Sequence, residues 1–145
     1  MEIYTIGFAK KSAAEFFGAL RQAGVKRLVD VRLKPDAPLA GFARARNLIF
    51  FLKELCGADY VHEPRLAPTA DLLERYRKKK ATWAEYEREF LALLIERTVA
   101  ETVDKGLFAG PVVLLCSEPV PAKCHRRLVA EHLQSRWGDV HVRHL

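Results

Sequence analysis

The residues best suited to chemistry lie near the carboxyl end of the chain. Cys116, Ser117 and Glu118 close an apolar run that begins at Val112, and Cys124, His125 and Arg126 follow after a short loop. Thiol, imidazole and carboxylate groups are the side chains that perform nucleophilic and general acid–base catalysis. The sequence therefore predicts four candidate catalytic residues, Cys124, His125, Glu118 and Cys116.

Cys124 is the stronger candidate for a reactive thiol. Pro119 and Pro121 restrain the preceding loop, so Cys124 falls in or near the first turn of the next helix. A helix amino terminus stabilises anions and lowers the pKa of a thiol, and an adjacent basic side chain adds to this effect. A small buried residue on an amphipathic helix is the alternative explanation, since free cysteines are among the most buried residues.

Cys116 ends a strand-like run. A role in core packing is therefore a simpler explanation for this cysteine than a reactive thiol. The two cysteines and His125 could also bind a soft metal or form a catalytic or regulatory dithiol. The interval between the cysteines is not a usual zinc spacing, so no metal ligands are predicted. The arginine that phosphatase loops place after their cysteine would fall at Ala122 or Ala130, which argues against that reaction.

A second group of residues has the character of an anion site. Arg32 and Arg126 form a plausible clamp, because the guanidinium fork matches phosphate and carboxylate geometry. Either Asp30 or Glu118 could act as a general base or could simply pair with these arginines. The net charge of +6 and the pI of about 9.4 favour anionic partners. The predicted anion-binding residues are Arg32, Arg126, Asp30, Tyr60 and Gly7.

The hydrophobic pattern predicts the elements that position these residues. Strands are expected at residues 3–6, 27–31, 59–62, 112–116 and 140–142. Capping-box patterns at Ser12 and Thr82 open two helices, the first ending at Gly24 and the second reaching Val99. Further helices are expected from Asn47 to Cys56, from Pro68 to Lys80, and from Ala122 to Trp137, and residues 32–46 read as a loop.

The alternation of strands and helices predicts an α/β fold. We expect a single three-layer domain over residues 1–145, with a mostly parallel sheet of about five strands flanked by helices. Ligands of such sheets bind beyond the carboxyl ends of the strands. Both groups of candidate residues follow strands, so they are expected to share one pocket at that edge.

Composition narrows the class of protein. No apolar run is long enough for a membrane helix, and no basic leader precedes an apolar segment, which predicts a cytoplasmic protein without membrane partners. Three cysteines do not make a disulfide framework. One Met, one Asn and two Gln hint at a thermophilic source. The basic run 75–80 could contact nucleic acid, although helix carboxyl ends also favour such charges.

Several of these stretches together resemble the DUF488 family over nearly the whole chain. The resemblance is carried by Tyr4-Thr5-Ile6-Gly7, Val29-Asp30-Val31-Arg32 with Pro35, Tyr60, Cys116-Ser117-Glu118 and Cys124-His125-Arg126. It implies an α/β domain and no established activity. Gly7-Phe8-Ala9 stands where the family commonly has Gly-His-Ser, and Leu66-Ala67-Pro68 where it has Leu-Gly-Gly, which is typical of a divergent member.

Two functions follow from the sequence. The first is an enzyme acting on an anionic small molecule or a nucleic-acid-related substrate. In it, Arg32 and Arg126 hold the anion while Cys124, His125 and Glu118 supply nucleophilic or acid–base chemistry. The alternative is a non-catalytic module that binds nucleotide or nucleic acid. No cofactor and no oligomeric state can be assigned from the residues.

Overall fold

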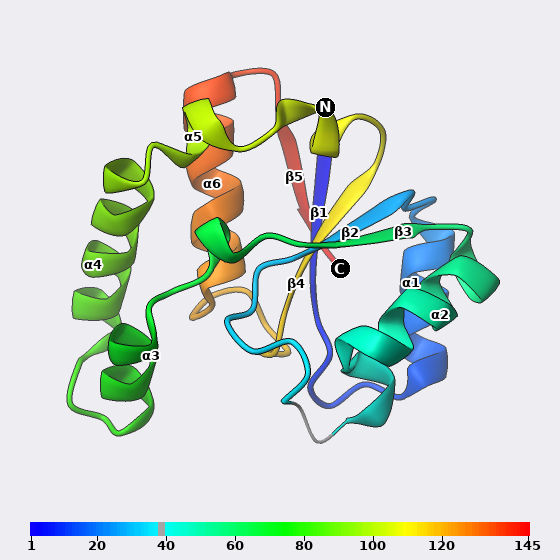
Figure 1. The fold of residues 1–145 in the computed structure, drawn as a ribbon, viewed down its shortest axis with the longest axis horizontal. Helices are drawn as coiled ribbons and strands as arrows, with labels where there is room; N and C mark the ends of the chain where they lie inside the picture. Colours follow the sequence, from blue (N-terminus) through cyan, green and yellow to red (C-terminus); the bar gives the residue numbers. More distant parts are fainter. Residues whose placement is uncertain (38–39) are drawn as a thin grey trace.

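The computed structural model describes residues 1–37 and 40–145 and centres on a five-stranded sheet (Figure 1). The spatial order is β3-β2-β4-β1-β5, and every neighbouring pair is parallel. All five residues of the central strand β4 are buried, as its unbroken apolar sequence predicts. The strands are β1 (Glu2–Gly7), β2 (Arg27–Asp30), β3 (Asp59–His62), β4 (Val112–Cys116) and β5 (His141–His144).

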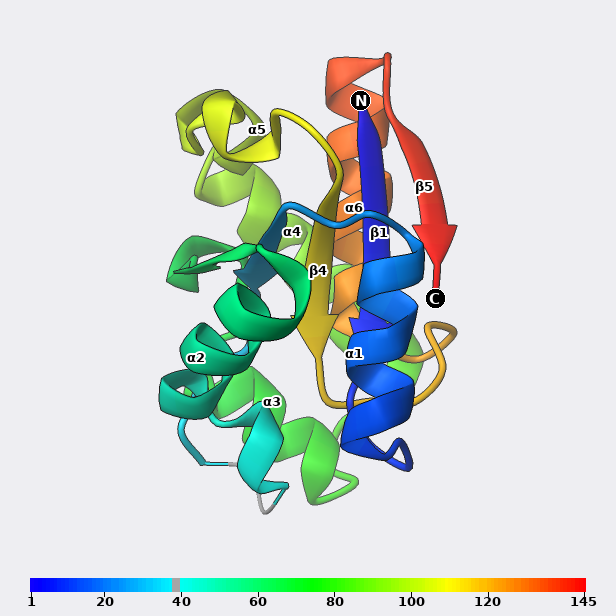
Figure 2. The ribbon, with the colours of Figure 1, turned by 90° about the vertical axis from the view of Figure 1, so that its right-hand side faces the viewer.

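Helices cover both faces of the sheet, which confirms the predicted three-layer α/β fold (Figures 1 and 2). One apolar core joins α1 (Ala13–Gln22) and α2 (Ala45–Cys56) to the sheet. The other joins it to α3 (Ala70–Arg77), α4 (Trp83–Glu96), α5 (Val99–Thr102) and α6 (His125–Trp137). None of the helices formed by residues 1–37 and 40–145 combines the length and apolarity that crossing a membrane requires.

Local sequence signals account for many of the helix ends. Ser12 and Thr82 each accept from the backbone N–H three residues later, and Glu15 and Glu85 complete both predicted capping boxes. Gly57 adopts the left-handed conformation at the end of α2. Thr69 caps α3 through its side chain.

Four predicted helices have wrong boundaries, and one of them, α3, spans Ala70–Arg77 instead of Pro68 to Lys80. The second helix begins at Ala45, and Asn47 lies within it, where its side-chain amide donates to the Gly41 carbonyl. The long helix ends at Glu96, because Thr98 has left-handed backbone angles, and buried Val99 belongs to the separate helix α5. The last helix begins at His125 rather than Ala122. Residues 38–39 of the predicted loop lie outside the described residues.

The strand order creates a crevice at the carboxyl edge. The chain leaves β2 for its outer neighbour β3, whereas it leaves β4 for β5 on the opposite side of the sheet. β2 and β4 are adjacent, so their outgoing connections diverge. Such a switch point is the usual position of ligands in open α/β sheets.

Candidate functional site

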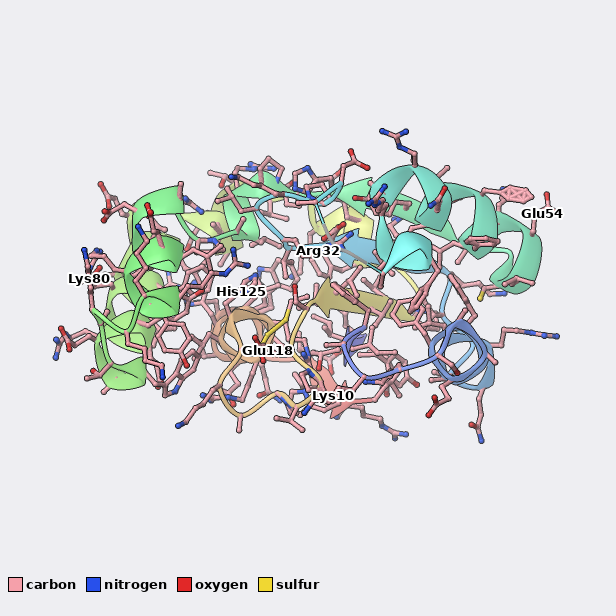
Figure 3. The ribbon with its side chains drawn as sticks, turned by 90° about the horizontal axis from the view of Figure 1, so that it is seen from below. Lys10, Arg32, Glu54, Lys80, Glu118 and His125 are labelled. Atoms are coloured by element: carbon pink, nitrogen blue, oxygen red, sulfur yellow. A yellow bond between two sulfur atoms is a disulfide. The ribbon has the colours of Figure 1, made fainter. Side chains whose placement is uncertain are left out.

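A pocket of about 1260 Å³ opens at this switch point. Its walls come from the segments after β1, β2 and β4, from α3 and the start of α4, and from the start of α6. Seen from this edge, Arg32, His125 and Glu118 lie near the middle of the molecule, between the helices of its two outer layers (Figure 3). The pocket is lined by the four candidate catalytic residues and by Arg32, whereas its described lining does not include the other predicted anion-binding residues, Arg126, Asp30, Tyr60 and Gly7.

Arg32 is held rigidly by the end of β2. Its Nε and Nη2 donate to the two carboxylate oxygens of Asp30 at 2.8 and 2.7 Å, and the pair is almost fully buried. Tyr60 donates its hydroxyl to Asp30 at 2.7 Å, and burial together with this bond raises the Tyr60 pKa. The remaining guanidinium nitrogen of Arg32, Nη1, is buried without a partner in the described structure, which is uncommon for a buried polar group.

Arg126 occupies a different position from the one expected. Its side chain is fully buried and lies behind the pocket wall rather than in it. It donates to the Thr5 hydroxyl at 3.2 Å, to the sulfur of Cys116 at 3.4 Å and to the carbonyl of Glu118 at 2.5 Å. Desolvation lowers its pKa to about 10. The two arginines therefore do not close on one space as a clamp in this conformation.

The two cysteines meet at the corner between β4 and α6. Cys116 is the last residue of β4, and Cys124 occupies the position immediately before α6. Their sulfur atoms are joined as a disulfide, and their Cα atoms are 7.6 Å apart. Cys56 is a free, half-buried thiol between α1 and α2, and burial raises its pKa. The tertiary structure thus brings Cys116, predicted at a strand end, against Cys124, the thiol predicted near a helix amino terminus.

His125 lies against the same pair with a fixed orientation. Its Nε2 is 2.7 Å from the carbonyl oxygen of Val31, and the Phe90 ring packs edge-on against the imidazole. A carbonyl only accepts, so Nε2 carries the proton and Nδ1 keeps its lone pair. Burial lowers the pKa of His125 to about 4, so the ring is neutral at neutral pH. It can act as a hydrogen-bond acceptor or ligand more readily than as a cationic partner.

Gly7 contributes space rather than a charged contact. A Cβ atom at this position would overlap the carbonyl of Glu118 and approach Nη1 of Arg126 to 2.8 Å. Glycine thus lets the loop after β4 cross directly over the end of β1. The backbone N–H groups of Phe8 and Ala9 donate to the carbonyls of Cys116 and Ser117, which fixes this crossing.

The rest of the lining is cationic and aromatic. Phe8 lies under the guanidinium of Arg32, with the central carbon 5.5 Å from the ring centroid. Tyr76, Trp83 and Tyr86 form a contacting group of rings on the α3–α4 side. Cations outnumber acids in the lining, which contains Arg32, Lys34, Arg77, Lys78, Lys79 and Lys123 against Glu74 and Glu118. The predicted basic run thus contributes to the pocket wall.

Some residues that support the candidate site could not be identified from the sequence. His62 contacts the Arg32 carbonyl at 2.8 Å and thereby supports the end of β2, although its spacing did not distinguish it from the other histidines. Thr5 contacts both Arg126 and His144 through its buried hydroxyl. A threonine within a strand-like run is common, so the pattern of the first strand did not indicate these contacts. Trp83 contacts Tyr76 where α3 and α4 meet, and it also lines the pocket.

Comparison with known proteins yields one family. The family model described as Domain of unknown function DUF488 matches residues 12–133. The match includes all the candidate residues except Gly7, which precedes it. No curated protein and no solved structure matches the chain.

Proposed function

This chain belongs to the DUF488 family, a domain of unknown function, and from that premise we propose that it is an enzyme acting on an anionic substrate. The substrate is a small molecule or a nucleic-acid-related group bound at the carboxyl edge of the sheet. Arg32 and the lysines of the rim hold its negative charge. Cys116, Cys124 and His125 form the reactive centre, and Glu118 is the carboxylate available beside it.

One observation carries this proposal: a buried, unpartnered donor and a reactive group line the same pocket. Nη1 of Arg32 lacks a partner among residues 1–37 and 40–145, while Asp30 already neutralises the arginine and holds it in place. Such a donor gains a strong charge-assisted bond when an anion enters. The paired cysteines and His125 line this pocket at the β4–α6 corner, and Arg32 lines it just beyond the end of β2.

The reactive centre also has features that favour thiolates. Arg126 donates to the sulfur of Cys116 and has no carboxylate within ion-pair distance among the described residues. Cys124 immediately precedes the first turn of α6, whose unpaired N–H groups stabilise negative charge. In this proposal Arg126 supports the sulfur and the Glu118 loop rather than touching the substrate.

Binding tests the anion half of the proposal. AMP, pyrophosphate and a labelled single-stranded oligonucleotide are titrated into metal-free protein at low and high salt, and the intrinsic fluorescence of Trp83 and Trp137 reports binding. The double variant Asp30→Asn, Arg32→Gln leaves no buried charge unpaired and should weaken binding roughly tenfold or more, since a bond to a charged group contributes about 1.5–3 kcal/mol. Arg136→Ala, an exposed site paired with Glu101, is the matched control. Equal affinities in all three proteins would refute this assignment.

Alkylation tests the catalytic half. Protein reduced and freed of metal is treated with iodoacetamide at neutral pH, and the labelling rate of each cysteine is measured by mass spectrometry. We expect Cys116 or Cys124 to react faster than Cys56, and a bound anion to protect them. Loss of protection in Lys34→Ala, Lys123→Ala protein would link the two halves. Slow labelling at both positions would rule out a reactive-thiol enzyme.

The aromatic group favours a second candidate function. Trp83 and Tyr86 are stacked with centroids 5.2 Å apart, beside the basic residues of α3. Bases stack on such rings in proteins that bind single-stranded nucleic acid. A non-catalytic nucleotide or nucleic-acid module is supported if the oligonucleotide binds with steep salt dependence while neither pocket cysteine shows enhanced reactivity.

A further inference from the structure

Three potential metal-binding atoms converge at the corner between β4 and α6. The sulfurs of Cys116 and Cys124 and a ring nitrogen of His125 all lie within 4.8 Å of one another. All three residues line the pocket. Among the described residues, no aspartate or glutamate belongs to this group. Two thiolates and one imidazole form a ligand set that suits soft or borderline divalent cations.

The surroundings of His125 match those of a metal ligand. Histidines bound to metals nearly always donate their other ring N–H to a carbonyl or carboxylate, which fixes the ring and its tautomer. His125 makes this contact through Nε2 to Val31 at 2.7 Å. Phe90 holds the ring from the side. Nδ1 is therefore the nitrogen that remains for coordination.

The surroundings of the sulfurs fit the same role. Arg126 donates to Cys116 at 3.4 Å, and it is a fully buried cation whose described partners are otherwise neutral. A thiolate at Cys116 would supply the missing negative charge. The Cα atoms of the two cysteines are 7.6 Å apart. Disulfides usually span about 4.4–6.8 Å between Cα atoms, so the corner is wider than a cross-link needs.

We propose that the reduced form of this corner binds one zinc-like divalent cation through Cys116, Cys124 and His125. Three protein ligands with one remaining position is the arrangement of catalytic rather than structural zinc sites. Because these residues line the pocket, the fourth position faces the space where the anionic group would enter. The metal site stands on its own ligands and does not require the proposed substrate.

The disulfide and the metal site are two states of the same atoms. Reduction by a phosphine cleaves the sulfur–sulfur bond, giving two thiols while the phosphine becomes its oxide with oxygen from water. Binding of the cation then releases two thiol protons and forms two metal–sulfur bonds.

Cobalt(II) serves as the probe. Reduced, metal-free protein is titrated anaerobically, and we expect one cobalt per chain with sulfur-to-cobalt charge-transfer absorption and intense visible bands of tetrahedral cobalt. Cys116→Ser and Cys124→Ser should each weaken binding by more than the roughly 10–100-fold caused by losing a hydrogen-bond partner of a ligand. His125→Ala should weaken binding and shift the visible bands. Cys56→Ser is the matched control and should leave the spectrum unchanged.

Thiol counting makes the result decisive. If reagent titration finds both pocket thiols free and cobalt still gives no charge-transfer band, the proposal is overturned. It is equally overturned if Cys56→Ser abolishes the band and the pocket variants do not. The experiment contains no anionic ligand, and anion binding is measured on metal-free protein, so failure of one proposal is distinguishable from failure of the other.

Discussion

The two buried arginines of the carboxyl edge lie in different electrostatic surroundings. Arg32 pairs with both oxygens of Asp30, lines the pocket and has one nitrogen, Nη1, without a partner among the described residues. Arg126 is more deeply buried and meets only a hydroxyl, a sulfur and a carbonyl in the described structure, where its Nη2 is likewise without a partner. The difference between the two arginines is electrostatic: Asp30 neutralises the one in the pocket wall, whereas the one behind the wall has only neutral groups and a sulfur around it.

The first way to test this comparison is to remove the acid on which Arg32 depends. Asp30→Ala leaves a buried guanidinium unpaired, which should cost about 3–5 kcal/mol of unfolding free energy. Asp59→Ala removes an exposed acid that pairs with Arg27 and Lys53, and it should cost at most about 1 kcal/mol. Urea denaturation measures both. Similar losses would show that Arg32 does not depend on Asp30.

A second change acts on the region around Arg126. Gly7→Ala places a methyl group against the Glu118 carbonyl and near the guanidinium, and crowding of this kind should cost about 1–3 kcal/mol. Gly18→Ala is the control, because no atom lies within 4 Å of its added Cβ and it sits inside α1. It should stabilise the protein by about 0.5–1 kcal/mol. Thermal unfolding of the two variants should therefore shift in opposite directions.

A smaller loss is expected at the outer support of the Arg32 pair. Tyr60→Phe removes a hydroxyl that donates to buried Asp30 at 2.7 Å. Since both guanidinium bonds to Asp30 remain, the expected loss is about 1.5 kcal/mol, at the low end for bonds to charged groups. Chemical denaturation at neutral pH provides the measurement. An unchanged midpoint and slope would mean that water replaces the hydroxyl without cost.

The smallest effect concerns a second copy of the Arg32 arrangement nearer the surface. Glu63 and Arg65 repeat the two-residue spacing and the paired contacts of Asp30 and Arg32, but Arg65 is 43 % exposed. Bonding to Arg65 lowers the pKa of Glu63 below its ordinary value of 4.5. This contribution is present above pH 4.5 and is lost as the pH falls through the lower pKa of the folded protein.

Glu63→Gln should therefore cost less than about 1 kcal/mol at pH 7, as expected for a solvent-screened pair. The difference from the unsubstituted protein should shrink as the pH falls below 4.5. Unfolding free energies measured across this range test the sign. A difference that grows toward low pH would contradict the assigned pairing.

Much of the fold was predictable because local patterns encode it. The apolar run 112–115, the capping boxes at Ser12 and Thr82, and Gly57 all form the structures that their sequences indicate. Errors occurred at helix ends where backbone conformation has weak sequence signals. Thr98 in the left-handed region is an example, because this conformation is uncommon for a β-branched residue.

The sequence by itself determined the chemistry at each strand end: a carboxylate and an arginine at the end of β2, a thiol at the end of β4, and a thiol and an imidazole at the start of α6. Only the tertiary structure decided which of them meet. Strand order made β2 and β4 neighbours, and the β4–α6 corner joined two cysteines whose spacing matches no usual metal motif. It also placed Arg32 in the pocket wall and Arg126 behind it. The physical reason is that burial and pairing depend on contacts between distant segments, which residue types and spacing do not specify.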